Sequence, residues 1–142
     1  MESPGFMEVG DDGGEDPVAG VGDAVPEVAD GIEDAEFTVV EDADVIGEAF
    51  GGFEDLNDDD WMKAYEFNVM STVRCTRAAL PHLRRSTLKR IINVSSISAQ
   101  QPGLYNPHYT VTKAAVVNLG KHLANILAKE KILVNTVCPG PV

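Results

Sequence analysis

Apolar residues are spread unevenly along the chain, and their pattern divides it near residue 50. Residues 1–50 consist mainly of Asp, Glu, Gly, Val and Ala. Like charges repel, and little aromatic surface is present to offset the entropy of ordering, so this acidic segment is predicted to be disordered. Within it, residues 37–40 could form one short strand. Residues 51–142 carry regular apolar patterns and are predicted to form a folded domain.

The first periodic stretch predicts a helix over about residues 58–85. Asn57 can cap this helix, and the aspartates at positions 58–60 would fill its first turn, where the helix dipole favours negative charge. Pro81 is expected to kink or close it. Apolar residues recur on most sides of the helix, which is typical of a helix packed on two sides; they are Trp61, Ala64, Phe67, Met70, Val73 and Leu80.

Two short strands and a second helix complete the pattern. Residues 90–94 and 132–137 are β-rich apolar runs, and the stretch between them predicts a helix over about residues 108–129. The order helix–strand–helix–strand, with continuous apolar strands, favours an α/β fold in which helices cover the faces of a parallel sheet.

Charge is as uneven as hydropathy. The chain has 142 residues and a formal net charge of −12, yet 21 of its 23 acidic residues lie in residues 1–60 and all 11 Lys and Arg lie in residues 61–142. A basic body could favour nucleic acid, but no aromatic residues are interleaved with the basic ones and no nucleic-acid motif occurs. We therefore expect solvated helix faces with some attraction for an anionic cofactor, and no nucleic-acid partner.

Cysteine usage and hydropathy bear on the compartment. Cys75 and Cys138 make no disulfide framework and suit a reducing environment. The first residues lack the basic and apolar regions of a signal peptide. No apolar run approaches the roughly 18–20 residues of a membrane span. We expect a cytoplasmic protein with no membrane partner and no metal site.

Tyr109 and Lys113 are the residues with the clearest chemical meaning. They are four positions apart in the second predicted helix, so they lie on one face, a turn apart. A phenol ordinarily holds its proton until about pH 10, too high for efficient proton exchange at neutral pH. A fixed ammonium nearby favours the phenolate, so the pair suits general acid–base work. His108, next to the tyrosine, is interpreted as a helix-start residue or a pocket wall.

Two further side chains belong with this pair. Ser96 lies thirteen residues before Tyr109, at the carboxyl end of a strand, which is the sheet edge where α/β proteins bind ligands. A serine hydroxyl there can donate to a substrate oxygen. Asn68 lies inside a helix, where an amide is a middling helix former. The alternatives stay open: Ser96 could simply end a strand, and Asn68 could be a buried amide satisfied by the backbone.

Four segments have a distinctive order and spacing: Asn68, Asn93-Val94-Ser95-Ser96, Tyr109-Thr110-Val111-Thr112-Lys113-Ala114-Ala115 and Val134-Asn135-Thr136-Val137-Cys138-Pro139-Gly140. Together they resemble the short-chain dehydrogenase/reductase family. The resemblance covers about residues 51–142 and implies part of a Rossmann-like, doubly wound parallel sheet. It also implies a homodimer or tetramer formed through the helices around 58–85 and 108–129.

The resemblance implies a catalytic role for four residues. Tyr109 would be the general acid in reduction and the base in oxidation. Lys113 would favour the phenolate and bind the nicotinamide ribose. Ser96 would orient the substrate carbonyl or hydroxyl group, and Asn68 would hold a water that links Lys113 to a proton relay.

The implied cofactor is NAD or NADP, and the implied substrate is a small alcohol or carbonyl compound. Tyr109 and Lys113 would bind the cofactor together with Pro139 and Gly140, which would line the nicotinamide pocket. The residue that separates NAD from NADP and the loop that selects the substrate both fall outside the matched segments, so both choices stay open.

The sequence departs from the family at its start. Such enzymes begin with a strand and a Thr-Gly-x-x-x-Gly-x-Gly turn, whose backbone amides hold the pyrophosphate. The nearest segment here is Gly20-Val21-Gly22, and Glu15-Asp16 stand where that pattern needs Thr-Gly. Glu48-Ala49-Phe50 stands where Asn-Asn-Ala-Gly is expected, and the chain ends at Val142.

Two functional hypotheses follow. One is an NAD(P)-dependent oxidoreductase that transfers hydride between the cofactor and an alcohol or carbonyl substrate. The other is a catalytically inactive remnant or truncated gene product that acts, if at all, as a dimerisation or interaction module. With about half of the usual fold missing, the isolated chain is expected to be marginally stable or aggregation-prone unless it dimerises.

Overall fold

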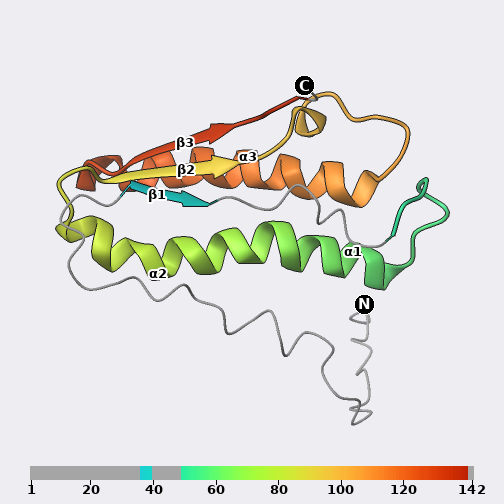
Figure 1. The fold of residues 1–142 in the computed structure, drawn as a ribbon, viewed down its shortest axis with the longest axis horizontal. Helices are drawn as coiled ribbons and strands as arrows, with labels where there is room; N and C mark the ends of the chain where they lie inside the picture. Colours follow the sequence, from blue (N-terminus) through green and yellow to red (C-terminus); the bar gives the residue numbers. More distant parts are fainter. Residues whose placement is uncertain (1–35, 40–48, 141–142) are drawn as a thin grey trace, which may run out of the picture.

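The computed structural model describes residues 36–39 and 49–140 (Figure 1). The disorder predicted for the acidic segment concerns, for the most part, residues outside these ranges. The described residues form an α/β fold with a parallel sheet, as the sequence pattern predicts. Its elements are β1 (Glu36–Val39), α1 (Asp58–Tyr65), a π-helical turn (Glu66–Met70), α2 (Ser71–Arg85), β2 (Arg90–Val94), a 3₁₀ turn (Ile97–Ala99), α3 (Pro107–Leu127), a second 3₁₀ turn (Ala128–Glu130) and β3 (Leu133–Val137).

The sheet has three parallel strands in the order β1-β2-β3. In its register, Thr38 of β1 pairs with Ile92 of β2, which in turn pairs with Asn135 of β3. The short strand suggested for residues 37–40 is thus present, shifted by one residue. This strand lies inside the acidic segment. The sheet therefore begins before residue 51, the position at which the sequence pattern predicts the start of the folded domain.

The first predicted helix begins as expected. Asn57 is the N-cap of α1 and forms a reciprocal capping box with Asp60. The Asp60 backbone N–H donates to the Asn57 side chain and the Asn57 backbone N–H donates to the Asp60 carboxylate, both at 3.1 Å. The box satisfies two of the N–H groups that a helix start leaves without partners.

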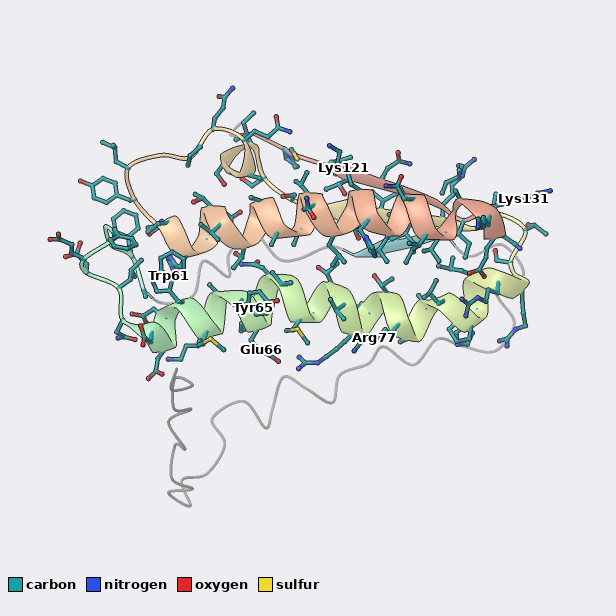
Figure 2. The ribbon with its side chains drawn as sticks, turned by 180° about the vertical axis from the view of Figure 1, so that it is seen from behind. Trp61, Tyr65, Glu66, Arg77, Lys121 and Lys131 are labelled. Carbon is teal, nitrogen blue, oxygen red and sulfur yellow. The ribbon has the colours of Figure 1, made fainter. Side chains whose placement is uncertain are left out.

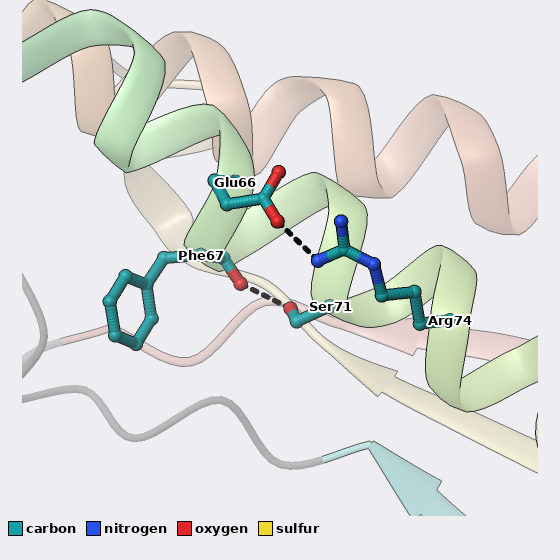
Figure 3. Close-up of polar contacts among 4 residues, drawn as sticks. All are labelled: Glu66, Phe67, Ser71 and Arg74. Carbon is teal, nitrogen blue, oxygen red and sulfur yellow. Dashed lines mark hydrogen bonds and ion pairs between the residues drawn. The ribbon is translucent and has the colours of Figure 1, made fainter. Parts of the chain in front are cut away.

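The middle of that helix differs from the prediction, because residues 66–70 form a π-helical turn between α1 and α2. Two side-chain contacts flank the wider turn, and both are drawn in Figure 3. The Ser71 hydroxyl donates to the Phe67 carbonyl, and Arg74 pairs with Glu66. Such turns often occur at functional sites, and this one carries Asn68.

Pro81 does not close the helix. It lies inside α2, which continues to Arg85. Proline lacks the N–H that would bond the preceding turn, and its ring crowds the carbonyl four residues earlier. Pro81 is exposed, so water can solvate the carbonyl that it leaves without a partner.

A compact core joins both long helices to the same face of the sheet. Ile91, fully buried in β2, packs in one cluster with residues of α2, α3 and the segment before β3. The other members are Ala79, Leu83, Leu123, Leu127 and Ile132. The alternate positions Leu133 and Val137 of β3 are 56% and 45% exposed. The described helices therefore cover one face of the sheet, and Figure 1 shows α3 behind the strands and α2 running below them.

Gly120 sets how closely α3 approaches the sheet. A Cβ at this position would lie 2.1 Å from Thr136 Oγ1 of β3 and 3.2 Å from Asn93 Nδ2 of β2. Only a residue without a side chain fits this crossing, which brings the middle of α3 against the two strands that lead to the candidate site.

Candidate active site

The candidate site lies at the carboxyl ends of β2 and β3. The loops that follow these strands continue their pairing, because Ser95 N–H donates to Val137 O at 2.8 Å and Ile97 N–H donates to Pro139 O at 2.9 Å. A Cβ on Gly140 would come within 3.8 Å of Ile97 Cγ2. The predicted cofactor residues Pro139 and Gly140 are thereby held beside the loop that carries Ser96.

Tyr109 and Lys113 occupy the first turns of α3, on one face as predicted. The Lys113 Nζ atom lies 5.6 Å from the centroid of the Tyr109 ring, within the range of a cation–π contact. Lys113 is 3% exposed and Tyr109 is half-buried. A buried ammonium is costly unless nearby groups compensate it, and the Tyr109 ring is one group that contacts it.

A buried hydrogen bond joins this helix to the end of β2. The Ser95 hydroxyl donates to the backbone carbonyl of Lys113 at 2.8 Å, and Ser95 is 5% exposed. Because Ser96 follows directly in the chain, the bond sets the position of the Lys113 turn relative to Ser96. Within the described residues, no hydrogen bond joins the Ser96 and Tyr109 side chains to each other.

The Ser96 hydroxyl oxygen accepts two hydrogen bonds from Ser98. The backbone N–H of Ser98 donates at 3.2 Å and its hydroxyl donates at 2.9 Å. Ser96 also caps the 3₁₀ turn over residues 97–99 and is half-buried. Ser96 follows the last residue of β2 by two positions and lies at the carboxyl edge of the sheet, where α/β proteins bind ligands.

Asn68 reaches α3 from the π-helical turn. Its side-chain amide donates to Thr112 Oγ1 at 2.8 Å, and the Thr112 hydroxyl donates to the Tyr109 carbonyl at 2.8 Å. Asn68 is 4% exposed. The amide nitrogen is therefore satisfied by a neighbouring side chain rather than by backbone, and it connects the π-helical turn to the helix of Tyr109 and Lys113.

His108 lies buried at the start of α3, 1% exposed. Its ring meets Trp61 of α1 edge-on, with centroids 6.3 Å apart, and Figure 2 shows Trp61 at the end of α1 that lies against the beginning of α3. Burial lowers the pKa of His108, and this effect outweighs the opposing influence of Asp60 and a backbone hydrogen bond at Ala49. The helix-start interpretation of His108 agrees with this position.

Sequence reasoning missed Ser95 and Ser98, which contact the predicted site residues. Serines separated by one residue at the end of a strand commonly form side-chain-to-backbone turns, so the Ser96-Ile97-Ser98 pattern was a usable signal for Ser98. No local pattern could indicate the bond from Ser95 to Lys113, because its partners are 18 residues apart.

The residues present fit the nicotinamide end of NAD(P) better than its pyrophosphate end. The Lys113 ammonium and the Tyr109 hydroxyl form a donor set that suits ribose hydroxyls. In the part of the chain that the structure describes, no helix begins at a glycine-rich phosphate turn. α1 begins with three aspartates, which would repel phosphate, and α3 begins at Pro107, which has no N–H.

Two further features concern metal binding and membrane spanning in residues 36–39 and 49–140. No group of three or more His, Cys, Asp or Glu side chains there is placed to hold a metal ion. No helix among these residues combines the length and the apolar character needed to cross a bilayer.

A family model and several known proteins are similar to this chain in sequence. The family model described as short chain dehydrogenase matches residues 38–142. The uncharacterized oxidoreductase YvrD of Bacillus subtilis is 33% identical over 105 residues, which are 70% of this chain and 40% of YvrD. Bovine dehydrogenase/reductase SDR family member 4 is 35% identical over 91 residues, 64% of this chain and 33% of the relative.

A solved structure agrees with these relatives. L-sorbose reductase from Gluconobacter frateurii, complexed with NADPH and L-sorbose, superposes with a TM-score of 0.62 at 37% identity. The superposition covers 65% of this chain and 35% of that enzyme. The chain thus spans about a third to two fifths of the length of these relatives.

Proposed function

Because the chain belongs to the short-chain dehydrogenase family, we propose that it is an NAD(P)-dependent oxidoreductase acting on an alcohol or carbonyl substrate. The observation that carries the proposal is the Lys113 ammonium, buried and 5.6 Å from the Tyr109 ring centroid. The oxidoreductase names of its relatives and the NADPH bound to L-sorbose reductase support the same chemistry.

In this proposal each catalytic residue either transfers a proton, stabilises a charge or orients the substrate. In reduction, the Tyr109 hydroxyl gives its proton to the substrate oxygen; in oxidation, the phenolate takes the proton of the alcohol. Lys113 stabilises the phenolate by its charge. The Ser96 hydroxyl donates a hydrogen bond to the same substrate oxygen and stabilises the charge that develops there.

When bound, NAD(P) would supply the hydride for reduction or take it up in oxidation. Lys113 and Tyr109 would hold its ribose, and Pro139 with Gly140 would line its nicotinamide pocket. Asn68, through Thr112, would keep the turn of α3 that carries both catalytic side chains in place and would hold a water of the proton relay. NAD and NADP are both compatible with these residues.

Replacement of Tyr109 by Phe tests the proposal. Turnover of NADH or NADPH with a panel of small ketones, and of NAD⁺ or NADP⁺ with the corresponding alcohols, should fall at least about a hundredfold, the usual scale of general acid–base catalysis. Tyr65→Phe is the matched control, because Tyr65 is 45% exposed on α1. Turnover in Tyr109→Phe equal to that of the wild type would rule out the proposed role.

A second function is favoured by one observation: the described residues include no glycine-rich helix start. On this alternative the chain is an inactive interaction module that pairs through its long helices. Met62 and Tyr65 of α1 and Val111 and Ile126 of α3 are all about half exposed or more. Fluorescence titration with NADH and NADPH separates the two functions. An inactive module should show no saturable binding below millimolar concentrations, whereas an enzyme should saturate.

A further inference from the structure

The Ser96 hydroxyl has an unusual set of partners. Ser98 donates to its oxygen twice, through the backbone N–H at 3.2 Å and through the hydroxyl at 2.9 Å. Within residues 36–39 and 49–140, the Ser96 hydroxyl has no other hydrogen-bond partner. Neither contact uses the proton of Ser96 itself.

A serine hydroxyl offers one proton and two acceptor lone pairs. With both lone pairs directed at Ser98, the remaining hydrogen-bonding capacity of Ser96 is its own O–H. In this arrangement the half-buried Ser96 hydroxyl presents its O–H to a ligand. A donor is what a carbonyl oxygen requires as negative charge grows on it during reduction.

The loop is held firmly enough to keep this orientation. Ala99 N–H donates to Ser96 O at 3.1 Å and Gln100 N–H donates to Ile97 O at 3.0 Å, which closes the 3₁₀ turn. Ile97 N–H donates to Pro139 O at 2.9 Å, which attaches the turn to the loop after β3. Ser98 thus lies in a turn whose backbone is held by hydrogen bonds at both ends.

We propose that Ser98 is a positioning residue that fixes the Ser96 side chain in one rotamer and commits its hydroxyl to donate to the substrate oxygen. The inference rests on the proposed function for its catalytic consequence, but not for its structural part. A hydroxyl that accepts a hydrogen bond becomes a stronger donor, so the Ser98 hydroxyl also strengthens the bond from Ser96 to the substrate.

The test compares Ser98→Ala, which removes only the hydroxyl, with Ser98→Thr, which keeps one. Gln101→Ala is the control for general disturbance of the loop, because Gln101 is exposed. The first measurement needs no ligand: the Hα–Hβ coupling constants of Ser96 in protein labelled at serine. Wild type, Ser98→Thr and Gln101→Ala should show a single rotamer, and Ser98→Ala should show averaged couplings.

The second measurement is steady-state turnover with a small ketone. Ser98→Ala should lower kcat roughly threefold to tenfold, the effect of one neutral hydrogen bond, with KM nearly unchanged and with recovery in Ser98→Thr. Averaged couplings in the wild type, or couplings unchanged in Ser98→Ala, would overturn the positioning role. So would an unchanged kcat in Ser98→Ala. If the wild type shows no turnover at all, the proposed function fails, and the couplings still decide the role of Ser98.

Discussion

At the scale of single residues, buried polar side chains connect the candidate site to its surroundings. Asn68 and Thr112 form a hydrogen-bonded pair between the π-helical turn and α3, and both are nearly inaccessible to solvent. A buried polar group that loses its partner is destabilising beyond the value of the bond itself. The pair therefore stabilises the fold as well as the position of the Tyr109 turn.

A double-mutant cycle measures that contribution. Asn68→Ala and Thr112→Val should each lower the free energy of unfolding by about 1–3 kcal/mol, because each leaves a buried group without its partner. The double variant should lose less unfolding free energy than the two single variants added together, and the difference, the coupling energy, should be about 0.5–1.5 kcal/mol. Urea unfolding of the four proteins gives these values, and strictly additive effects would contradict the predicted pair.

His108 predicts a dependence of stability on pH. Burial lowers its pKa in the folded chain below the ordinary value near 6.5, so the unfolded chain binds the proton first as pH falls. Its contribution to stability is complete above about pH 6.5 and is lost as pH falls from there through the lower, folded pKa. Between these two pKa values, the free energy of unfolding can change by up to about 1.4 kcal/mol per pH unit.

The comparison of wild type with His108→Gln isolates this contribution. Urea unfolding between about pH 7.5 and 5 should give a steeper loss of stability in the wild type, because the glutamine does not titrate. His82→Gln is the matched control for replacing a histidine by glutamine, because His82 is only half-buried whereas His108 is fully buried. Equal slopes in wild type and His108→Gln would exclude His108 as the cause.

At the scale of elements, the crossing of α3 over β2 and β3 decides where the site residues lie. Gly120 permits the contact, and Ser95 bonds the same helix two turns earlier, at Lys113. The two contacts hold α3 against the sheet in the region where Tyr109 and Lys113 meet the strand ends.

Gly120→Ala tests the crossing. Alanine favours a helix by about 1 kcal/mol over glycine, but its Cβ would lie 2.1 Å from Thr136 Oγ1, so we expect a net loss of about 1–3 kcal/mol. Gly103→Ala is the control, because a Cβ there meets nothing within 4 Å. In a Thr136→Ala background the clash disappears and most of the loss should be recovered. Thermal and urea unfolding report both effects, and a stabilised Gly120→Ala would refute the close approach.

At the scale of the whole molecule, one face of the sheet has no helix over it in the described residues. Leu133 and Val137 are exposed there, while α2 and α3 cover the opposite face. Parallel sheets are ordinarily covered on both faces, because their strands are apolar on both sides. The described part of the fold therefore buries less apolar surface than a complete sheet of this kind.

This arrangement predicts limited stability for the isolated chain. Circular dichroism combined with sedimentation velocity should find either a monomer that melts well below about 60 °C, the upper part of the usual mesophile range, or an associated species. A monomer that melts cooperatively above that temperature would contradict the prediction. A variant with Leu133→Thr and Val137→Thr should associate less, because the two substitutions reduce the apolar area of the exposed sheet face.

Local patterns determined much of this protein from sequence alone. The apolar run at residues 90–94 is β2 with the predicted bounds, and Asn57 caps α1 as predicted, because both features depend on neighbours within a few residues. The four-residue spacing of Tyr109 and Lys113 on a helix brings the ammonium beside the phenol without any long-range contact. The family resemblance rested on the same short segments.

Only the tertiary structure decided the remainder. The π-helical turn carries Asn68, which bonds Thr112 of α3, and α2 continues past Pro81 to Leu83, which packs in the core with residues of α3. These contacts and the pairing of β1 with β2 join distant segments, which no local period encodes. The bond from Ser95 to Lys113 and the close approach at Gly120 join elements that are far apart in the chain. Sequence periodicity thus identified the chemical groups and the elements that carry them, whereas packing between elements set the distances between those groups.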